Sequence, residues 1–191
     1  MTAKVIDGVA IAQQVRAEVA AAVKERVSQG KTVPGLAAVL VGENPASQVY
    51  VRNKRKACEE VGIASFGFEL PATASQAEVE GLVSQLNADP KVHGILVQLP
   101  LPAGLDEQRV LNAISIEKDV DGFHPLNLGR LAQKGRDPLF VPCTPAGCMV
   151  MLEKELPSLE GVNAVVLGRS NIVGMPVALL LVRANATVTI C

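Results

Sequence analysis

The sequence predicts an α/β protein in which helices alternate with the strands of a mainly parallel sheet. Three observations favour this class. Short aliphatic runs such as GLAAVLV alternate along the chain with longer segments of helical periodicity. Hydrophobic residues make up 49% of the chain but aromatic residues only 3%, so Val, Leu, Ile and Ala must build the core, as they do in buried parallel strands. Helix-start signals such as Asn44-Pro45 follow the aliphatic runs.

The first 100 residues contain the signals of three helices and three strands. Apolar residues at every fourth position predict the first helix, Asn44-Pro45 begins the second, and a Ser75/Glu78 capping box begins the third. A glycine stands at the end of each of the first two helices, Gly30 and Gly62, as is common at helix ends. The predicted helices are residues 8–30, 45–61 and 75 to about 86, and the predicted strands are residues 35–41, 65–70 and 94–99.

The second half of the chain begins with a stretch rich in Gly, Pro and Asp, from 114 to 142, which predicts loops and one short helix near 126–131. Thr144-Pro145 then predicts the start of a helix. The remaining predicted elements are the helix 144–155, the strand 162–167, the turn 168–174, the helix 175–184 and a buried strand 187–191. The last strand–helix–strand unit is shorter than the βαβαβ unit of a dinucleotide-binding half, so we expect this domain to be incomplete.

The overall charge and the cysteines exclude several classes of protein. Lys and Arg total 18 against 19 for Asp and Glu, so charge gives no reason to expect nucleic acid or an anionic membrane as a partner. The N-terminus carries Asp7 where a signal peptide needs an apolar run, and no apolar run reaches the ~18 residues of a membrane span. The four cysteines match neither a disulfide framework nor a zinc site, which favours free thiols in a reducing cytoplasm. They are Cys58, Cys143, Cys148 and Cys191.

One charge in the segment 41–63 is unusual. On a helical wheel, Lys54 is the only charge on an otherwise apolar face. That face also carries Ser47, Tyr50, Ala57, Cys58 and Val61, whereas Arg52, Arg55, Lys56 and Glu59 lie opposite. Lys54 either extends its ammonium to the edge of the face or lines a cleft where it exchanges protons near neutral pH. Tyr50, one turn earlier, either lies beside it or packs in the core.

Two further positions are candidates for binding. Gln98 follows an apolar strand at the carboxyl end, which faces the ligand crevice in open α/β sheets, although its amide could equally satisfy loop backbone. EKDVDGFHP lacks the ligands of a calcium loop. Asp119 and Asp121 are either turn formers or carboxylates that accept N–H donors from a heterocycle. His93 and His124 have no metal-ligand partners at useful spacing, so no metal is expected.

The turn 168–174 joins a strand to a helix, where a phosphate-binding turn belongs. Its pattern, G-x-S-x-x-x-G, is a weak signal by spacing alone. Arg169 is either a partner for a 2′-phosphate, which would favour NADP, or a solvated surface arginine.

Five segments resemble, in order, successive motifs of the methylenetetrahydrofolate dehydrogenase/cyclohydrolase family. They are VGENPASQVYVRNKRKA, GILVQLPLP, EKDVDGFHPLNLGRL, PCTPAG and VVLGRSNIVGMPVALLL. The resemblance implies oxidation of 5,10-methylenetetrahydrofolate to the methenyl form, with hydride passing to NADP. It also implies hydrolysis of the methenyl form to 10-formyltetrahydrofolate at the same folate site, as part of the one-carbon chemistry that serves purine biosynthesis.

By motif position, the resemblance implies that Lys54 transfers protons, that Gln98 holds and tunes Lys54, and that Tyr50 packs against the aromatic middle of the folate. Asp121 would bind the pterin ring and Ser47 would support the Tyr50/Lys54 end of the cleft. The NADP turn would contain Gly168, Arg169 and Ser170.

The resemblance also implies an organisation for the chain. We expect a folate-binding catalytic domain over 1–140 and an incomplete Rossmann-like NADP-binding domain over 141–191, with the boundary between 122 and 146. The family implies a cytoplasmic homodimer that acts on tetrahydrofolate derivatives, with no nucleic-acid or membrane partner.

Two other hypotheses remain open from the sequence. A different two-domain dehydrogenase acting on a hydroxy or amino acid would share the α/β layout, but the motifs at 41–63 and 117–125 argue against it. A non-catalytic folate-binding module is disfavoured because Lys54, Gln98 and Asp121 are all present.

Overall fold

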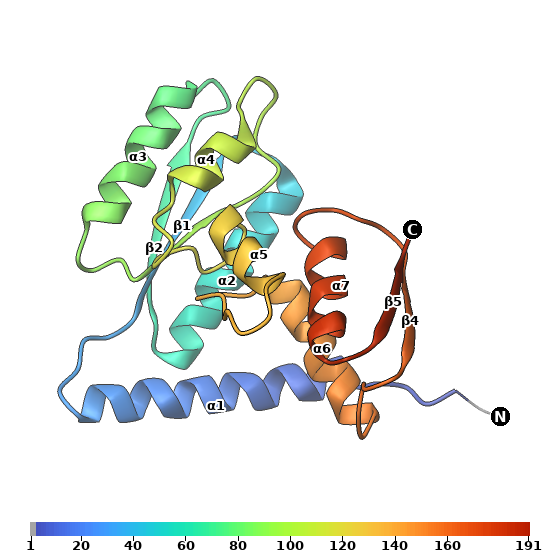
Figure 1. Cartoon of the computed structure of the whole chain (residues 1–191). Coiled ribbons are helices and arrows are strands. Elements are labelled where there is room, and N and C mark those ends of the chain that lie inside the picture. The colour runs from blue at the N-terminus through green and yellow to red at the C-terminus, as the bar shows by residue number, and fades with distance from the viewer. Residues whose placement is uncertain (1–2) are drawn as a thin grey trace. The chain divides into compact units, whose positions relative to one another are not determined.

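The computed structural model describes residues 3–191 of the chain (Figure 1). It divides into two compact units. One contains Ala12–Asp119, and the other contains Val120–Cys191 together with residues 3–11. Each unit has a parallel sheet and flanking helices, which confirms the predicted α/β class.

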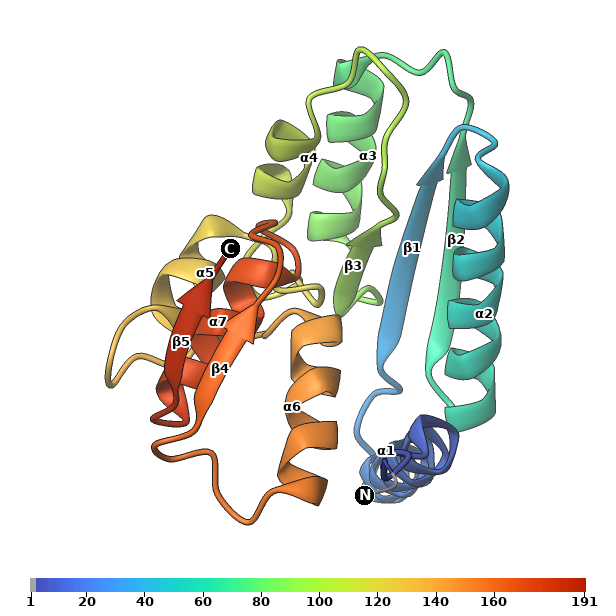
Figure 2. The same cartoon turned by 90° about the vertical axis from the view of Figure 1, so that its right-hand side faces the viewer.

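The unit of residues 12–119 is built on a three-stranded parallel sheet. β1 (Gly35–Val41) lies between β2 (Ala64–Leu70) and β3 (Gly94–Val97). β1 and β3 are aliphatic and largely buried, as strands covered on both faces are, whereas β2 is only partly buried. Figure 2 shows the helix α2 along one face of this sheet and the helices α3 and α4 on the other side, beside β3.

The helix α2 (Pro45–Val61) begins and ends at strong sequence signals. Asn44 Oδ1 accepts hydrogen bonds from the backbone N–H groups of Ala46 at 3.0 Å and Ser47 at 3.1 Å. Gly62 ends the helix in the left-handed conformation, with φ of 81°. Because both ends are fixed, the direction in which each α2 side chain points is fixed as well. The helix α1 (Gly8–Ser28) places Val23 against the turn at Gly62.

The helix α3 (Gln76–Ala88) has the predicted capping box. Ser75 Oγ accepts from the Glu78 N–H at 3.3 Å, and Glu78 Oε2 accepts from the Ser75 N–H at 2.7 Å. The short helix α4 (Glu107–Ala113) was not predicted, because seven residues are too few to show a helical period. It begins at Asp106, whose side chain accepts from the Arg109 N–H.

The segment after α4 closes the outer edge of β3. The backbone N–H of Ile95 donates to Lys118 O at 2.8 Å, and Ile95 forms a parallel bridge with Asp119. Lys118 Nζ donates to three carbonyls at the C-terminal end of α3, those of Leu86, Asn87 and Asp89, at 2.8 to 3.0 Å. Backbone and side chain of Lys118 therefore hold this segment to both β3 and α3.

The other unit contains the helices α5 (Pro125–Leu131), α6 (Cys143–Glu155) and α7 (Gly174–Arg183), and the parallel strands β4 (Asn163–Val166) and β5 (Thr187–Ile190). Its apolar core joins α6 and α7 through Met149, Leu159 and Leu181, with Ala164, Val166 and Val188 of the strands packed against it. Val165, on the other face of β4, is 65% exposed.

Several predicted details in this unit are wrong. β5 is exposed or half-buried along its length rather than buried, because α7 covers one face of the two-stranded sheet and the described residues do not cover the other. Thr144 does not cap α6; it lies in the first turn, after the N-cap residue Pro142, which makes no side-chain cap bond. In the first unit, β3 ends at Val97 rather than at residue 99.

Neither a membrane-spanning helix nor a metal-binding group of residues is found within residues 3–191. No helix in this range is both long enough and apolar enough to cross a membrane. No group of three or more His, Cys, Asp or Glu residues in the same range could hold a metal ion.

Candidate functional site

Lys54 and Gln98 meet at the carboxyl end of the three-stranded sheet. Lys54 Nζ donates a hydrogen bond of 3.1 Å to Gln98 Oε1. Gln98 Nε2 donates to Leu99 O at 2.7 Å, and the Gln98 backbone N–H donates to Val39 O at 2.9 Å. Hydrogen bonds at its side-chain nitrogen and its backbone N–H therefore hold Gln98 in place, and its amide oxygen faces the Lys54 ammonium. Both side chains are half-buried.

The aromatic ring on the Lys54 face of α2 is not a core residue. Tyr50, one turn before Lys54, is 61% exposed, which removes the alternative of ordinary core packing. Ser47, a further turn back, is buried, with 2% of its surface exposed. The same helix face thus carries an accessible aromatic ring beside a half-buried amine. An exposed ring of this kind can stack on a planar ligand.

The two aspartates of EKDVDGFHP have different surroundings. Asp119 is 1% exposed and bridges to Ile95 at the edge of β3, so it is a structural residue of the first unit. Asp121 is half-buried and belongs to the second unit. It precedes Gly122, which has a φ of 68° and where an added Cβ would lie 2.8 Å from Pro142 N. Only glycine fits there, so the turn that carries Asp121 is held tightly against residues 140–142.

The turn between β4 and α7 is also closely packed. Gly168 has a φ of 114°, and Ser170 Oγ accepts from the backbone N–H groups of Val173 at 3.2 Å and Gly174 at 3.3 Å. A Cβ at Gly174 would lie 2.1 Å from Gly168 O, so the backbone can approach itself this closely only with glycine at 174. Arg169 is exposed.

This turn fits a dinucleotide phosphate. It follows a parallel strand and opens a helix of ten residues, and its glycines allow a ligand to approach the backbone at a helix N-terminus. Ser170, predicted to belong to the cofactor turn, also shapes that turn by accepting two of its N–H groups. Arg169 extends a cationic side chain from the same turn.

The histidines have the structural roles expected of them. His93 Nδ1 accepts from the Gly35 N–H at 3.0 Å at the start of β1. His124 Nδ1 accepts from the Leu126 N–H at 3.2 Å at the start of α5. The cysteines are free thiols. Burial raises the pKa of the Cys58 thiol, and the neighbouring Glu59 carboxylate raises it further.

Two positioning side chains were not found from the sequence. Lys118 caps three carbonyls of α3, and Arg183 binds the carbonyls of Leu131, Gln133 and Arg136 as well as the Asp137 carboxylate. Lys118 lies in the segment EKDVDGFHPLNLGRL and Arg183 in the predicted helix 175–184, but neither pattern assigned a role to these side chains. A basic residue near a helix C-terminus is only a weak sequence signal for carbonyl binding. The carbonyls that it binds come close to it only in the folded chain.

Known proteins match the chain along nearly all of its length. Residues 6–121 match the family model "Tetrahydrofolate dehydrogenase/cyclohydrolase, catalytic domain", and residues 142–191 match the NAD(P)-binding domain of the same family. The "Bifunctional protein FolD" of Moorella thermoacetica is 60% identical over 194 residues, which cover 100% of this chain and 67% of that protein. "Bifunctional protein FolD 2" of Arabidopsis thaliana is 57% identical over 188 residues, which cover 98% of this chain and 63% of that protein.

Solved structures also match along nearly the whole chain. The FolD of Trypanosoma brucei, crystallised with NADP cofactor and an inhibitor, is 41% identical with a TM-score of 0.95 and covers 100% of this chain and 65% of that one. The chain thus spans about two thirds of the length of the proteins it matches, or less.

Proposed function

Because the chain belongs to the tetrahydrofolate dehydrogenase/cyclohydrolase family, we propose that its protein carries out both reactions of that name. It oxidises 5,10-methylenetetrahydrofolate to 5,10-methenyltetrahydrofolate with NADP, and it hydrolyses the methenyl form to 10-formyltetrahydrofolate. Relatives named as bifunctional proteins support the two activities, and the relative crystallised with NADP supports the cofactor.

The observation that carries the proposal is the hydrogen bond between Lys54 Nζ and Gln98 Oε1. Hydrolysis needs a group that removes a proton from water as the water adds to the methenyl carbon. The methenyl form is a cation, so an amine in its neutral form can take that proton without placing a second positive charge beside it beforehand. Lys54 is half-buried and held in place by a fixed amide, which suits this role.

The other residues bind and orient the substrate. Tyr50 stacks on the aromatic middle of the folate, since its ring is accessible one turn from Lys54. Ser47 supports that end of the site, and Asp121 accepts hydrogen bonds from the N–H groups of the pterin. Gln98 orients Lys54.

NADP would be held by the turn after β4. Gly168 and Gly174 allow close approach of the phosphates, Ser170 shapes the turn, and Arg169 binds the 2′-phosphate, which favours NADP over NAD. The bound cofactor supplies the acceptor for the hydride. The protein's part in that step is to align the substrate, which falls to Tyr50.

The proposal extends to the organisation of the protein. The two family matches end at 121 and begin at 142, which supports a folate-binding domain over 1–140 and an NADP-binding domain over 141–191 with the boundary within 122–146. We infer a homodimer in the cytoplasm, without nucleic-acid or membrane partners, on the strength of the family and of the free thiols.

Assays of the full-length protein test the function. With methylenetetrahydrofolate and NADP, we expect NADPH and the methenyl product to form together; with methenyltetrahydrofolate alone, we expect its decay to exceed the uncatalysed rate. Absence of both reactions in a folded protein would refute the proposal, and decay of the methenyl form without NADPH formation would restrict it to the hydrolase.

A further inference from the structure

The loop that follows Gln98 carries the carbonyl that fixes its amide. This loop, residues 99–106, leads to α4, and Leu99 O accepts from Gln98 Nε2 at 2.7 Å. An amide donates from its nitrogen and accepts at its oxygen, so a carbonyl beside Nε2 makes Oε1 face Lys54. If Leu99 O moved away, the amide could turn over and present its N–H groups to the ammonium. The position of the loop therefore sets whether the pair forms.

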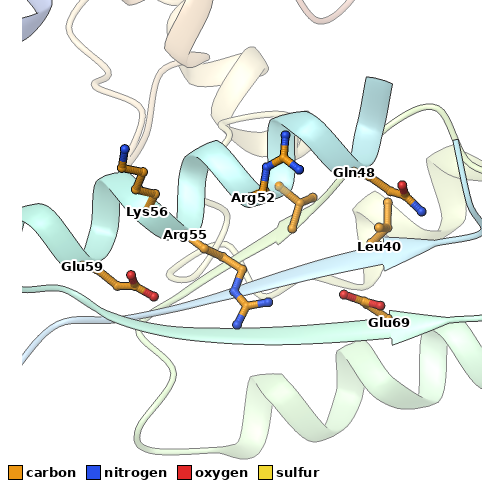
Figure 3. A pocket seen from close by; sticks show the side chains of 8 residues that line it. Leu40, Gln48, Arg52, Arg55, Lys56, Glu59 and Glu69 are labelled. Atoms are coloured by element: carbon orange, nitrogen blue, oxygen red, sulfur yellow. The ribbon is translucent and has the colours of Figure 1, made fainter. Parts of the chain in front are cut away.

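Lys54 has no second partner that could replace Gln98. Among the described residues, Gln98 is the only group that forms a hydrogen bond with the Lys54 ammonium. The neighbouring cations Arg52 and Arg55 line a groove of about 410 Å³ on the other face of the helix, between α2 and the strands β1 and β2 (Figure 3). The orientation of Lys54 thus depends on the amide and, through the amide, on the loop.

Two prolines limit how this loop can be held. Pro100 and Pro102 carry no N–H, so Leu101 supplies the only backbone donor among residues 100–102. The Leu101 N–H donates to Glu107 Oε1 at 2.8 Å. The ring of Pro100 fixes φ between Leu101 and Leu99, so a displacement of Leu101 is largely passed on to the Leu99 carbonyl. The Glu107 carboxylate is thus the anchor of this end of the loop.

Glu107 stands on a part of the fold that is itself fixed. It is the first residue of α4, whose Val110 and Leu111 are buried. Gln76 of α3 holds the preceding residue at two points: Oε1 accepts from the Asp106 N–H at 2.8 Å, and Nε2 donates to Asp106 O at 3.3 Å. The Glu107 side chain is half-buried. Because the acceptor has a fixed place, the loop that it binds has one as well.

We propose that Glu107 is a positioning residue for the proton transfer assigned to Lys54. It holds Leu101, which holds the Leu99 carbonyl, which in turn orients the Gln98 amide toward Lys54. This inference rests on the proposed function and adds to it a residue from α4. Glu107 acts through the place of its oxygen atom and not through its charge.

Two substitutions separate the reach of the side chain from its charge. Glu107→Gln keeps an oxygen at the same distance from the backbone but has no charge, whereas Glu107→Asp keeps the charge but is one methylene shorter. In the full-length protein, Glu107→Gln should retain most of the cyclohydrolase kcat. Glu107→Asp and Glu107→Ala should each lower it about tenfold, the effect of losing one well-aligned hydrogen bond. A carboxylate that merely stabilised the start of α4 by its charge would give the opposite order for Asp and Gln.

Gln108→Ala is the matched control for changes in α4. Gln108 is the next residue of the helix, is exposed, and among the described residues binds only the side chain of Asn112, at 2.9 Å. Its loss should leave the cyclohydrolase kcat unchanged. A loss as large as that of Glu107→Ala would show that any disturbance of α4 lowers the rate, and would overturn the specific role of Glu107.

A double-mutant cycle tests whether the effect passes through Gln98. In the Gln98→Met background the amide is gone, so Glu107→Ala should cause no further loss in kcat. Its effect on thermal stability should persist in both backgrounds, because the loop still loses its anchor. Equal losses of kcat in the two backgrounds would show that Glu107 acts by another route, and would overturn the proposal.

The Gln98 amide can also be observed without any assay of activity. In isotope-labelled protein, its side-chain N–H signals are the ones that disappear in Gln98→Met. One of these protons donates to Leu99 O. Glu107→Ala should shift the signal of that proton, whereas Glu107→Gln and Gln108→Ala should leave it in place. A signal that stays in place in Glu107→Ala would overturn the proposal.

The outcomes separate this role from the proposed function. A folded wild-type protein without cyclohydrolase activity refutes the function and with it the role of Glu107. If the wild type is active, a Glu107→Ala variant with the wild-type rate refutes the role of Glu107 alone, and so does a Glu107→Asp variant that is faster than Glu107→Gln. If Glu107→Ala does not fold, the comparison of Glu107→Asp with Glu107→Gln decides.

Discussion

Gln98 presents its amide oxygen to the Lys54 ammonium at 3.1 Å, across 44 residues of sequence. The same amide donates to Leu99 O, so Gln98 cannot turn without breaking a second bond of 2.7 Å. A lysine that merely extended into solvent would need no such partner. Under the proposed function, we therefore expect proton transfer to be more sensitive to substitution at this pair than elsewhere in the fold.

Lys54→Met should remove most cyclohydrolase activity from the full-length protein while leaving it folded. Methionine keeps much of the length and apolar contact of the side chain but cannot accept a proton. The expected loss in kcat is about 10²- to 10⁴-fold, the usual scale of general acid–base assistance. Dehydrogenase activity should fall less, because hydride transfer depends on alignment. Parallel assays with a thermal-melt control measure this; near wild-type hydrolysis by a folded variant would contradict it.

Gln98→Glu should lower the cyclohydrolase kcat more than Gln98→Met does. A carboxylate beside Lys54 stabilises the ammonium, which cannot accept a proton from water. Gln98→Met is the control, because it removes the hydrogen bond without adding a charge. Equal losses in the two variants would argue against Lys54 as the proton acceptor.

Gly174→Ala should weaken NADP binding at least tenfold and lower the melting temperature. The added methyl would lie 2.1 Å from Gly168 O, so the turn before α7 must open. Gly147→Ala, in the interior of α6, is the matched control: nothing lies within 4 Å of its added Cβ. That change should be neutral or stabilise by about 0.5–1 kcal/mol. Equal melting temperatures in the two variants would show that the turn is not constrained.

Arg169→Ala should raise the KM for NADP much more than the KM for NAD. Arg169 extends from the turn after β4, and a guanidinium binds a phosphate through paired hydrogen bonds. NAD lacks the 2′-phosphate and should lose little. Steady-state kinetics with both cofactors measure the difference. An equal rise in KM for both cofactors would show that Arg169 does not bind the 2′-phosphate.

Glu78→Gln should cost stability at neutral pH and progressively less in acid. Hydrogen bonds from the Ser75 backbone and hydroxyl lower the pKa of Glu78 below its ordinary value of 4.5. A carboxylate whose pKa is lowered by folding contributes stability that is complete above the unfolded pKa and is lost as the pH falls through the folded pKa. Denaturant unfolding of both proteins at pH 7 and near pH 3 gives the comparison. A stability difference between the two proteins that does not shrink in acid would show that the charged Glu78 carboxylate is not its cause.

The parts of the fold with local causes were predictable. α2 was found at its true ends because Asn44, Pro45 and Gly62 act on neighbouring backbone groups. β1 was found because six aliphatic residues in a row, after Gly35, are typical of a buried strand. The exposure of β5 was not predictable, because it depends on what covers the sheet rather than on the strand itself. In the candidate site, the helical wheel isolated Lys54, but its bond to Gln98 forms only once α2 packs on the sheet in which β3 ends.

The contacts of Arg183 affect which positions of the segment 131–137 can be substituted in evolution. Its guanidinium binds the carbonyls of Leu131, Gln133 and Arg136, at 3.0 to 3.5 Å, and these belong to the main chain rather than to side chains. Every amino acid supplies a carbonyl, so the identity of residues such as Gln133 and Arg136 matters little to these contacts. The path of the segment therefore depends strongly on position 183, some 46 to 52 residues away. Exposed positions such as Gln133 and Arg136 are free to accumulate substitutions, whereas Asp137 binds Arg183 through its side chain and is not.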